Sequence, residues 1–166
     1  MYNTLAIANF FIKSSFATGD ELTPMKLIKL CYIAHGWHLG LYEKPLLDEP
    51  VYAWKFGPVV VNVYHHFKCF GNSRITSYAK TINGIELPNV PETEAFLERI
   101  WDVYKKFDGI QLSAMTHQKD TPWDIVYNQM NGKVNKDSII PDNIIEQHYK
   151  TLMKKAPENE PRAVQA

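Results

Sequence analysis

Apolar residues recur every three or four positions through most of the chain, which is the period of an α-helix with one buried side. The stretch 24–40 is apolar around much of its circumference, so we expect it to lie at the centre of the fold. The spacing predicts helices over about 2–16, 24–40, 57–70, 92–107 and from 141 onward, with shorter helical turns at 112–116 and 121–124.

Residues that start and stop helices lie at the ends of these segments. Gly19 is expected to end the first helix, because a left-handed C-cap costs glycine the least. Thr23-Pro24 is typical of an N-cap followed by the first helical position. Thr121-Pro122 repeats that arrangement, with Asp124 placed to return the cap of Thr121. Asp108-Gly109 is predicted to close the long helix over 92–107.

The segment 51–56 alternates instead, as a strand does, and Gly57-Pro58 ends it. One side presents the aromatic residues Tyr52, Trp54 and Phe56, and the other presents Val51, Ala53 and Lys55. Because an alternating strand buries one face, we expect Trp54 in the core and Lys55 at the surface. The alternative is that the aromatic side chains bind a partner protein, since buried aromatic residues dominate interface energies.

The remaining segments complete the predicted architecture. Residues 72–90 fit a short hairpin around Asn83-Gly84 or an ordered loop. The stretch from Lys154 has two prolines and almost no apolar side chains. We therefore predict a mainly α fold with one small β-sheet (α+β): a single compact domain over 1–153 and a disordered tail over 154–166. A length of 166 residues fits one domain.

Charge and composition narrow the function classes. Eighteen basic and eighteen acidic residues cancel, so net electrostatics give no support for nucleic-acid binding. The N-terminal apolar run has no basic region or cleavage site before or after it, and it is too short to span a bilayer. Cys31 and Cys69 fall on predicted apolar helix faces, where buried free thiols are expected. These features predict a cytoplasmic protein with no membrane partner.

Histidine and cysteine are the residues to test for chemistry. His35 and His38 are three positions apart on a predicted helix, and His65-His66 precedes Cys69. Neither group belongs to a recognisable ligand set such as H-E-x-x-H, so chance or surface placement is preferred to a metal site. His117 is expected to bond to the backbone or pack near Trp123 rather than to act in catalysis. We expect no metal, no cofactor, no glycine-rich phosphate loop and no catalytic residue.

One set of positions resembles a known family, the Panacea (SocA-like) antitoxin domains of bacterial and prophage toxin–antitoxin pairs. Its most specific part is the block Ala53-Trp54-Lys55-Phe56-Gly57-Pro58-Val59 at the strand-to-helix break. The other matching residues are Thr23, Pro24, Lys26, Leu27, Lys29, Leu30, Tyr32, Ala34, Gly36, Trp37, Pro45-Leu46, Asp48-Glu49, Leu112-Ser113, Thr116-His117, Trp123 and the segment 144–149.

The resemblance implies a non-enzymatic protein that neutralises a cognate toxin by binding it directly. It also implies, for some relatives, an adaptor role that delivers the toxin to an AAA+ protease. Many relatives have added DNA-binding segments, and this chain offers no room for one, so operator binding is not expected. Oligomeric state and the identity of the toxin do not follow from the sequence.

Two other function classes stay open at this point. One is a phage or prophage protein that binds a host protein unrelated to a toxin. The other is a small hydrolase that uses His117 or the cluster of His65, His66 and Cys69. For partner binding we expect the surface at the break, with a helical face across from it: Trp54, Lys55, Phe56, Gly57, Pro58, Lys26, Lys29 and Tyr32.

Overall fold

The computed structural model describes residues 1–80, 84, 87–130, 132–135 and 137–155. Its elements confirm the predicted α+β class: several helices and one small antiparallel sheet. The helices are α1 (Thr4–Thr18), α2 (Pro24–Tyr42), α3 (Val61–Phe67), α4 (Pro91–Tyr104), α5 (Gly109–Thr116), α6 (Pro122–Asp124) and α7 (Asp142–Lys155). The strands are β1 (Val51–Trp54), β2 (Gly57–Val59) and β3 (Ile139–Ile140). Three short helical turns complete the list: a 3₁₀ turn (Lys68–Phe70) after α3, a π-helical turn (Ile125–Gln129) after α6, and a second 3₁₀ turn (Gly132–Val134).

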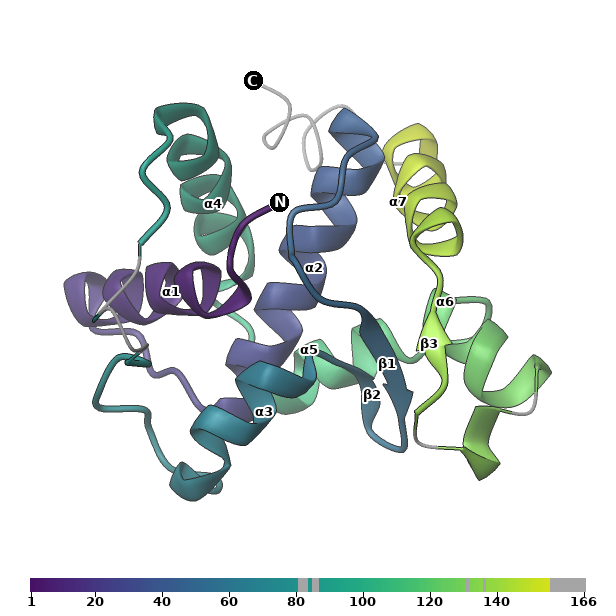
Figure 1. The fold of residues 1–166 in the computed structure, drawn as a ribbon, viewed down its shortest axis with the longest axis horizontal. Coiled ribbons are helices and arrows are strands. Elements are labelled where there is room, and N and C mark those ends of the chain that lie inside the picture. The colour runs from purple at the N-terminus through teal and green to yellow at the C-terminus, as the bar shows by residue number, and fades with distance from the viewer. Residues whose placement is uncertain (81–83, 85–86, 131, 136, 156–166) are drawn as a thin grey trace.

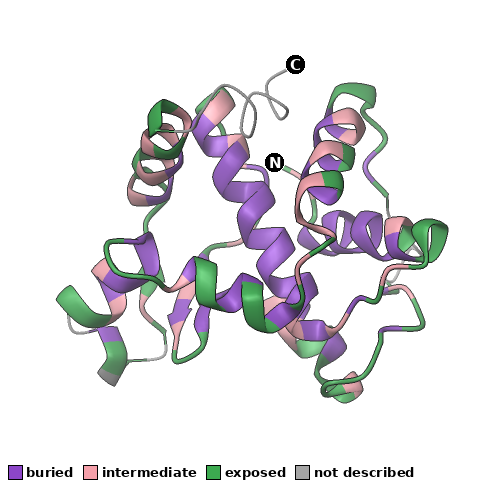
Figure 2. Ribbon diagram, turned by 180° about the vertical axis from the view of Figure 1, so that it is seen from behind, coloured by how far each residue is buried: buried purple, intermediate pink, exposed green. Residues whose placement is uncertain are grey.

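Helix α2 lies at the centre of the molecule, as its apolar circumference predicts. It passes between α1 and α4 on one side and α7 on the other, with α3, α5 and the sheet around its N-terminal half (Figure 1). Figure 2 shows that it is buried along almost its whole length. The Thr23 side chain caps its first turn and Pro24 occupies the first helical position, so the predicted start is confirmed.

Helix α7 packs closely on α2 because two glycines of α2 leave room for one aromatic ring. Gly36 and Gly40 both face Tyr149, and a Cβ added to Gly40 would lie 2.8 Å from the Tyr149 Cβ. The Tyr149 ring meets Tyr32 and Trp37 edge to face, at centroid distances of 6.2 and 5.1 Å. Of the expected α7 stripe, Ile145 and Tyr149 are buried and Leu152 is exposed. Residues 156–166 of the expected tail lie outside the described residues.

The imidazole of His35 ties three segments together inside the fold. Its Nδ1 accepts hydrogen bonds from the backbone N–H groups of Leu46 and Leu47, both at 3.3 Å. With Nδ1 an acceptor, Nε2 carries the proton and donates to Asp142 Oδ1 at 3.0 Å. His35 is 1% exposed. His35 is thus a buried structural residue, because the ring satisfies backbone groups that burial would otherwise leave unpaired.

The sheet has the order β2-β1-β3, with β1 antiparallel to both neighbours. Strand β1 covers only part of the predicted 51–56, because the chain turns at Lys55 and Phe56 and returns as β2, which was expected to be helical. Lys55 is exposed as expected, but the aromatic residues do not form the buried face. Val51 and Ala53 are buried, whereas Tyr52 and Trp54 are half-buried and Phe56 is 63% exposed.

Three other local expectations are corrected by the structure. Asp108 does not close α4; it caps α5, with its side chain and that of Gln111 forming a reciprocal capping box. Asp124 accepts from the backbone N–H of Asp120 instead of that of Thr121. Cys69 is exposed, while Cys31 is buried. The expected hairpin at Asn83-Gly84 falls largely on residues outside the described part of the chain.

Candidate functional site

A buried lysine fixes the backbone of the turn between β1 and β2. Lys29 reaches up from α2, and its Nζ donates to the backbone carbonyls of Phe56 and Pro58, both at 2.9 Å. The side chain is 2% exposed, and burial lowers the pKa of its ammonium from 10.5 to about 7. The two carbonyl dipoles favour the charged form, so they oppose part of that desolvation.

Gly57 is required where the lysine passes under the turn. Its φ is +106°, in the region that favours glycine, and a Cβ there would lie 2.7 Å from Lys29 Nζ. The Gly-Pro pair is therefore part of a fitted contact: Gly57 allows the close approach and Pro58 supplies one of the carbonyls.

Helix α5 holds the same turn from a second side. Ser113 Oγ donates to Phe56 O at 2.9 Å, so this carbonyl has two donors. His117 Nδ1 lies 3.4 Å from Ser113 Oγ. Burial, with a smaller contribution from the Lys29 charge, lowers the pKa of His117. Because the serine proton is directed at the Phe56 carbonyl, Ser113 and His117 are arranged as supports of the turn.

Trp123 of α6 provides a third contact to the backbone at this turn. Its Nε1 donates to the Trp54 carbonyl at 2.6 Å, and its ring lies edge to face with His117 at 5.2 Å. The packing predicted for His117 near Trp123 is therefore confirmed. The Tyr127 ring stacks on the Trp123 ring with a centroid distance of 4.5 Å. Lys29, Ser113 and Trp123 thus come from three helices and fix the backbone of one turn.

Lys26 and Tyr32 do not belong to a surface across from the turn. Lys26 is 4% exposed; its Nζ donates to Lys105 O at 2.6 Å and lies 5.5 Å from the Trp101 ring centroid. Tyr32 is 1% exposed, in the core beside Tyr149. The expected placement of Lys26 and Lys29 on a helical face open to a partner is wrong, since both side chains end on backbone carbonyls inside the fold.

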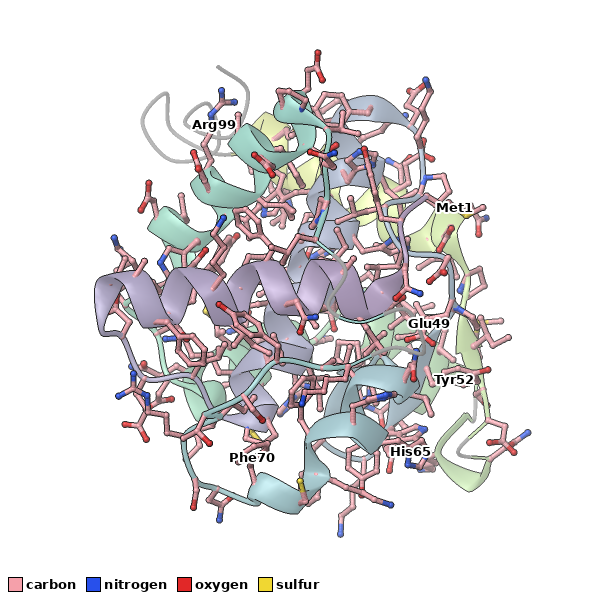
Figure 3. All side chains as sticks on the ribbon, turned by 60° about the vertical axis from the view of Figure 1, so that its left-hand side comes forward. Met1, Glu49, Tyr52, His65, Phe70 and Arg99 are labelled. Atoms are coloured by element: carbon pink, nitrogen blue, oxygen red, sulfur yellow. The ribbon has the colours of Figure 1, made fainter. Side chains whose placement is uncertain are left out.

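A groove with a volume of about 890 Å³ runs beside the supported turn. Its walls come from the N-terminal part of α2, from β1 and β2, from α3 with its following turn, and from Tyr127, Gly132 and Lys133. Trp54 lines it, with its ring edge to face against Tyr64 at 5.0 Å. In Figure 3, Tyr52 on β1 and His65 on α3 lie on the same side of the molecule.

The rim of the groove exposes an aromatic ring and a charge together. Phe56 projects from the turn, and Lys55 Nζ lies 5.5 Å from its ring centroid. Both residues line the groove. Of the expected partner-binding residues, Trp54, Lys55 and Phe56 therefore reach this surface, Gly57 and Pro58 shape the turn beneath it, and Lys29 supports it.

The other candidate chemistries have no matching arrangement in the described residues. No group of three or more His, Cys, Asp or Glu side chains there could hold a metal ion. His65 and His66 are exposed on α3, and Cys69 is exposed in the turn that follows. Within that part of the chain, no helix has the length and hydropathy that crossing a membrane requires.

Comparison with known proteins identifies the scaffold that presents this groove. The sequence matches the family described as "Antitoxin SocA-like, Panacea domain" over residues 27–124, a range that contains Lys29, the whole turn, Ser113 and Trp123. The chain belongs to this family. A relative, Antitoxin SocA of Caulobacter vibrioides (strain NA1000 / CB15N), is 28% identical over 152 residues, which cover 87% of this chain and 81% of the relative. No solved structure was found to match the chain.

For this Panacea domain, sequence reasoning found the turn but missed much of the groove. Tyr64, Lys68, Tyr127 and Lys133 line it and were not among the expected binding residues. No local pattern distinguishes them, because they lie on separate elements that only the tertiary fold brings to one surface.

Proposed function

We propose that this protein is the antitoxin of a toxin–antitoxin pair and that it neutralises the toxin by direct binding at the groove beside the β1–β2 turn. The observation that carries the proposal is the combination of an exposed aromatic rim and a rigid base. Phe56 is 63% exposed, yet its own carbonyl is fixed by Lys29 and Ser113. An exposed ring on an immobilised backbone is suited to binding, because little conformational entropy is lost when a partner covers it.

Membership of an antitoxin family and a relative named as an antitoxin support the same proposal. A binding role is favoured over hydrolysis by the direction of the Ser113 proton, which goes to a structural carbonyl instead of to His117. Among the residues described, the exposed Cys69 and its neighbouring histidines also belong to no group of three side chains that could hold a metal ion.

The test is co-expression with the product of the adjacent gene, scored for growth and for co-purification. We expect that product to be toxic alone, harmless with this protein, and recovered in a complex with it. A harmless neighbour that does not associate would contradict the proposal. Rescue without a stable complex would contradict simple occlusion and favour delivery of the toxin for degradation.

Phe56→Ala locates the binding surface within that assay. The truncation removes an exposed ring and leaves the backbone contacts of residue 56 in place, so the fold should be retained. We expect binding to weaken at least about tenfold, because truncating an aromatic residue at an interface hot spot costs about 2 kcal/mol or more of binding free energy. Ile110→Ala is the matched control, since Ile110 is 76% exposed on α5 and does not line the groove.

A further inference from the structure

The charged side chains that line the groove are all basic, although the chain as a whole is neutral. Lys29, Lys55, Lys68 and Lys133 line it together with His65, and none of the described lining residues is an aspartate or a glutamate. The full sequence has equal numbers of basic and acidic residues, so this is a local concentration of positive charge. Lys55, Lys68 and Lys133 are all exposed.

These three lysines are not paired within the described part of the protein. The ion pairs found there involve other residues, and the nearest partners of Lys55 and Lys68 are aromatic rings: Phe56 at 5.5 Å and Tyr64 at 6.0 Å from the ring centroids. An ammonium group beside an aromatic ring keeps most of its capacity to bind a carboxylate. The groove therefore offers positive charges and aromatic surface side by side.

The edge of β2 does not offer an alternative mode of recognition by strand addition. Strand addition requires free backbone donors and acceptors along the edge. Here Pro58 has no N–H, and its carbonyl accepts from Lys29, as does that of Phe56. A partner must be recognised mainly through side chains, which makes the charge and shape of the groove the basis of specificity.

We propose that the groove binds an acidic segment of the toxin that also carries an aromatic or aliphatic residue, with Lys55, Lys68 and Lys133 pairing with its carboxylates. The apolar side chain lies against Trp54, Ile28 and Val59, which line the same groove as the lysines. This inference rests on the proposed antitoxin function and specifies the chemistry of the partner. A protein segment is favoured over nucleic acid, because the chain as a whole is neutral and gives no general electrostatic attraction for a phosphate backbone.

The test compares charge reversal inside and outside the groove on the full-length protein. The double variant Lys68→Glu/Lys133→Glu reverses two groove lysines, and Lys13→Glu/Lys80→Glu reverses two exposed lysines elsewhere. Binding is measured by calorimetry with the purified product of the adjacent gene, at low and at moderate salt. We expect the groove variant to bind at least about tenfold more weakly with a smaller salt dependence, and the control variant to stay within about twofold.

Overlapping synthetic peptides that cover the toxin sequence identify the segment. The expected binder is an acidic peptide with one large apolar residue, and exchanging its carboxylates for lysines should restore binding to the groove variant while abolishing binding to the wild type. Equal losses in the groove and control variants, or binding only of basic peptides, would overturn the inference and leave the antitoxin function standing. Groove-dependent binding of an oligothymidylate in place of any peptide would overturn it in favour of nucleic acid. Failure of the wild type to bind the toxin at all would overturn both proposals.

Discussion

Lys29 determines the local structure of the turn, although its residue type alone indicates a solvent-exposed position. Four methylene groups carry its amine from α2 to two carbonyls of the β1–β2 turn, where no described carboxylate compensates its charge. Burying an unpaired ammonium is costly, and the hydrogen bonds to backbone dipoles offset part of that cost. Burying Lys29 therefore lowers the free energy of unfolding somewhat, while its hydrogen bonds fix the conformation of the turn.

Replacing Lys29 by methionine should destabilise the fold in a pH-dependent way. Pro58 O loses its donor, and a buried acceptor without a partner costs about 1–3 kcal/mol. The pKa of Lys29 falls from 10.5 to about 7 on folding, so between these values the unfolded wild type binds a proton that the folded protein does not. Wild-type stability therefore rises with pH across that range, relative to the variant.

Urea unfolding at pH 7, 8.5 and 10 measures this difference. Relative to the wild type, the loss in the free energy of unfolding of Lys29→Met should grow from pH 7 to pH 10. It should be constant below pH 7, where Lys29 is protonated in both the folded and the unfolded wild type. Lys55→Met is the matched control, because Lys55 is exposed beside the same turn. A deficit that shrinks with rising pH would mean that the folded protein holds the ammonium form.

At the scale of helices and strands, helix geometry and the Tyr149 ring determine how α7 packs on α2. Glycine is unfavourable inside a helix by roughly 1 kcal/mol relative to alanine, yet α2 has it at positions 36 and 40, four residues apart on one face. Both face Tyr149, so the close approach of the two helices compensates for the lower helix propensity.

Gly36→Ala should therefore destabilise the protein, although alanine is the better helix former. The added methyl group overlaps the Tyr149 ring, and overpacking of this kind costs about 1–3 kcal/mol beyond the propensity gain. Chemical denaturation of Gly36→Ala, Tyr149→Leu and the double variant forms a cycle. We expect the double variant to be less destabilised than the sum of the singles; strict additivity would show that α7 does not contact α2 at this ring.

At the scale of the whole molecule, a few buried polar side chains join segments that are far apart in sequence. Lys29 and Ser113 join α2 and α5 to the sheet, and His35 joins α2 to the 46–47 segment and to the start of α7. These connections fix α5, the sheet, the 46–47 segment and α7 in position around α2.

His35→Ala should weaken the connection of α7 and of the 46–47 segment to α2. Two buried backbone N–H groups lose their acceptor, and we expect a loss of about 2–4 kcal/mol in the free energy of unfolding. Hydrogen exchange should accelerate at the Leu46 and Leu47 amides.

Asp142→Asn provides the control for His35→Ala. The asparagine Oδ1 still accepts from the imidazole Nε2, and Asp142 lies at the surface, so we expect a change below about 1 kcal/mol. If His35→Ala were as mild as Asp142→Asn, the imidazole would not be the acceptor that those two amides require.

The sequence by itself determined the helical architecture, the start of α2 at Thr23 and the family. Helix period and N-cap chemistry act within a few residues, so they can be read without knowing the fold. The same holds for the block around Trp54 and Gly57, which indicated that the first strand ends there, although the segment after it was expected to be helical.

Only the tertiary structure decided which face of β1 is buried and where Lys26, Lys29 and His35 lie. A strand pattern gives two faces but not the side on which the rest of the fold packs, and in the structure the face with Val51 and Ala53 is the buried one. Lysine and histidine can be buried only where distant carbonyls, amides or carboxylates meet them, and those partners are 11 to 107 residues away along the chain. The groove has the same origin, because its lysines come from separate elements and become one charged surface only when the chain is folded.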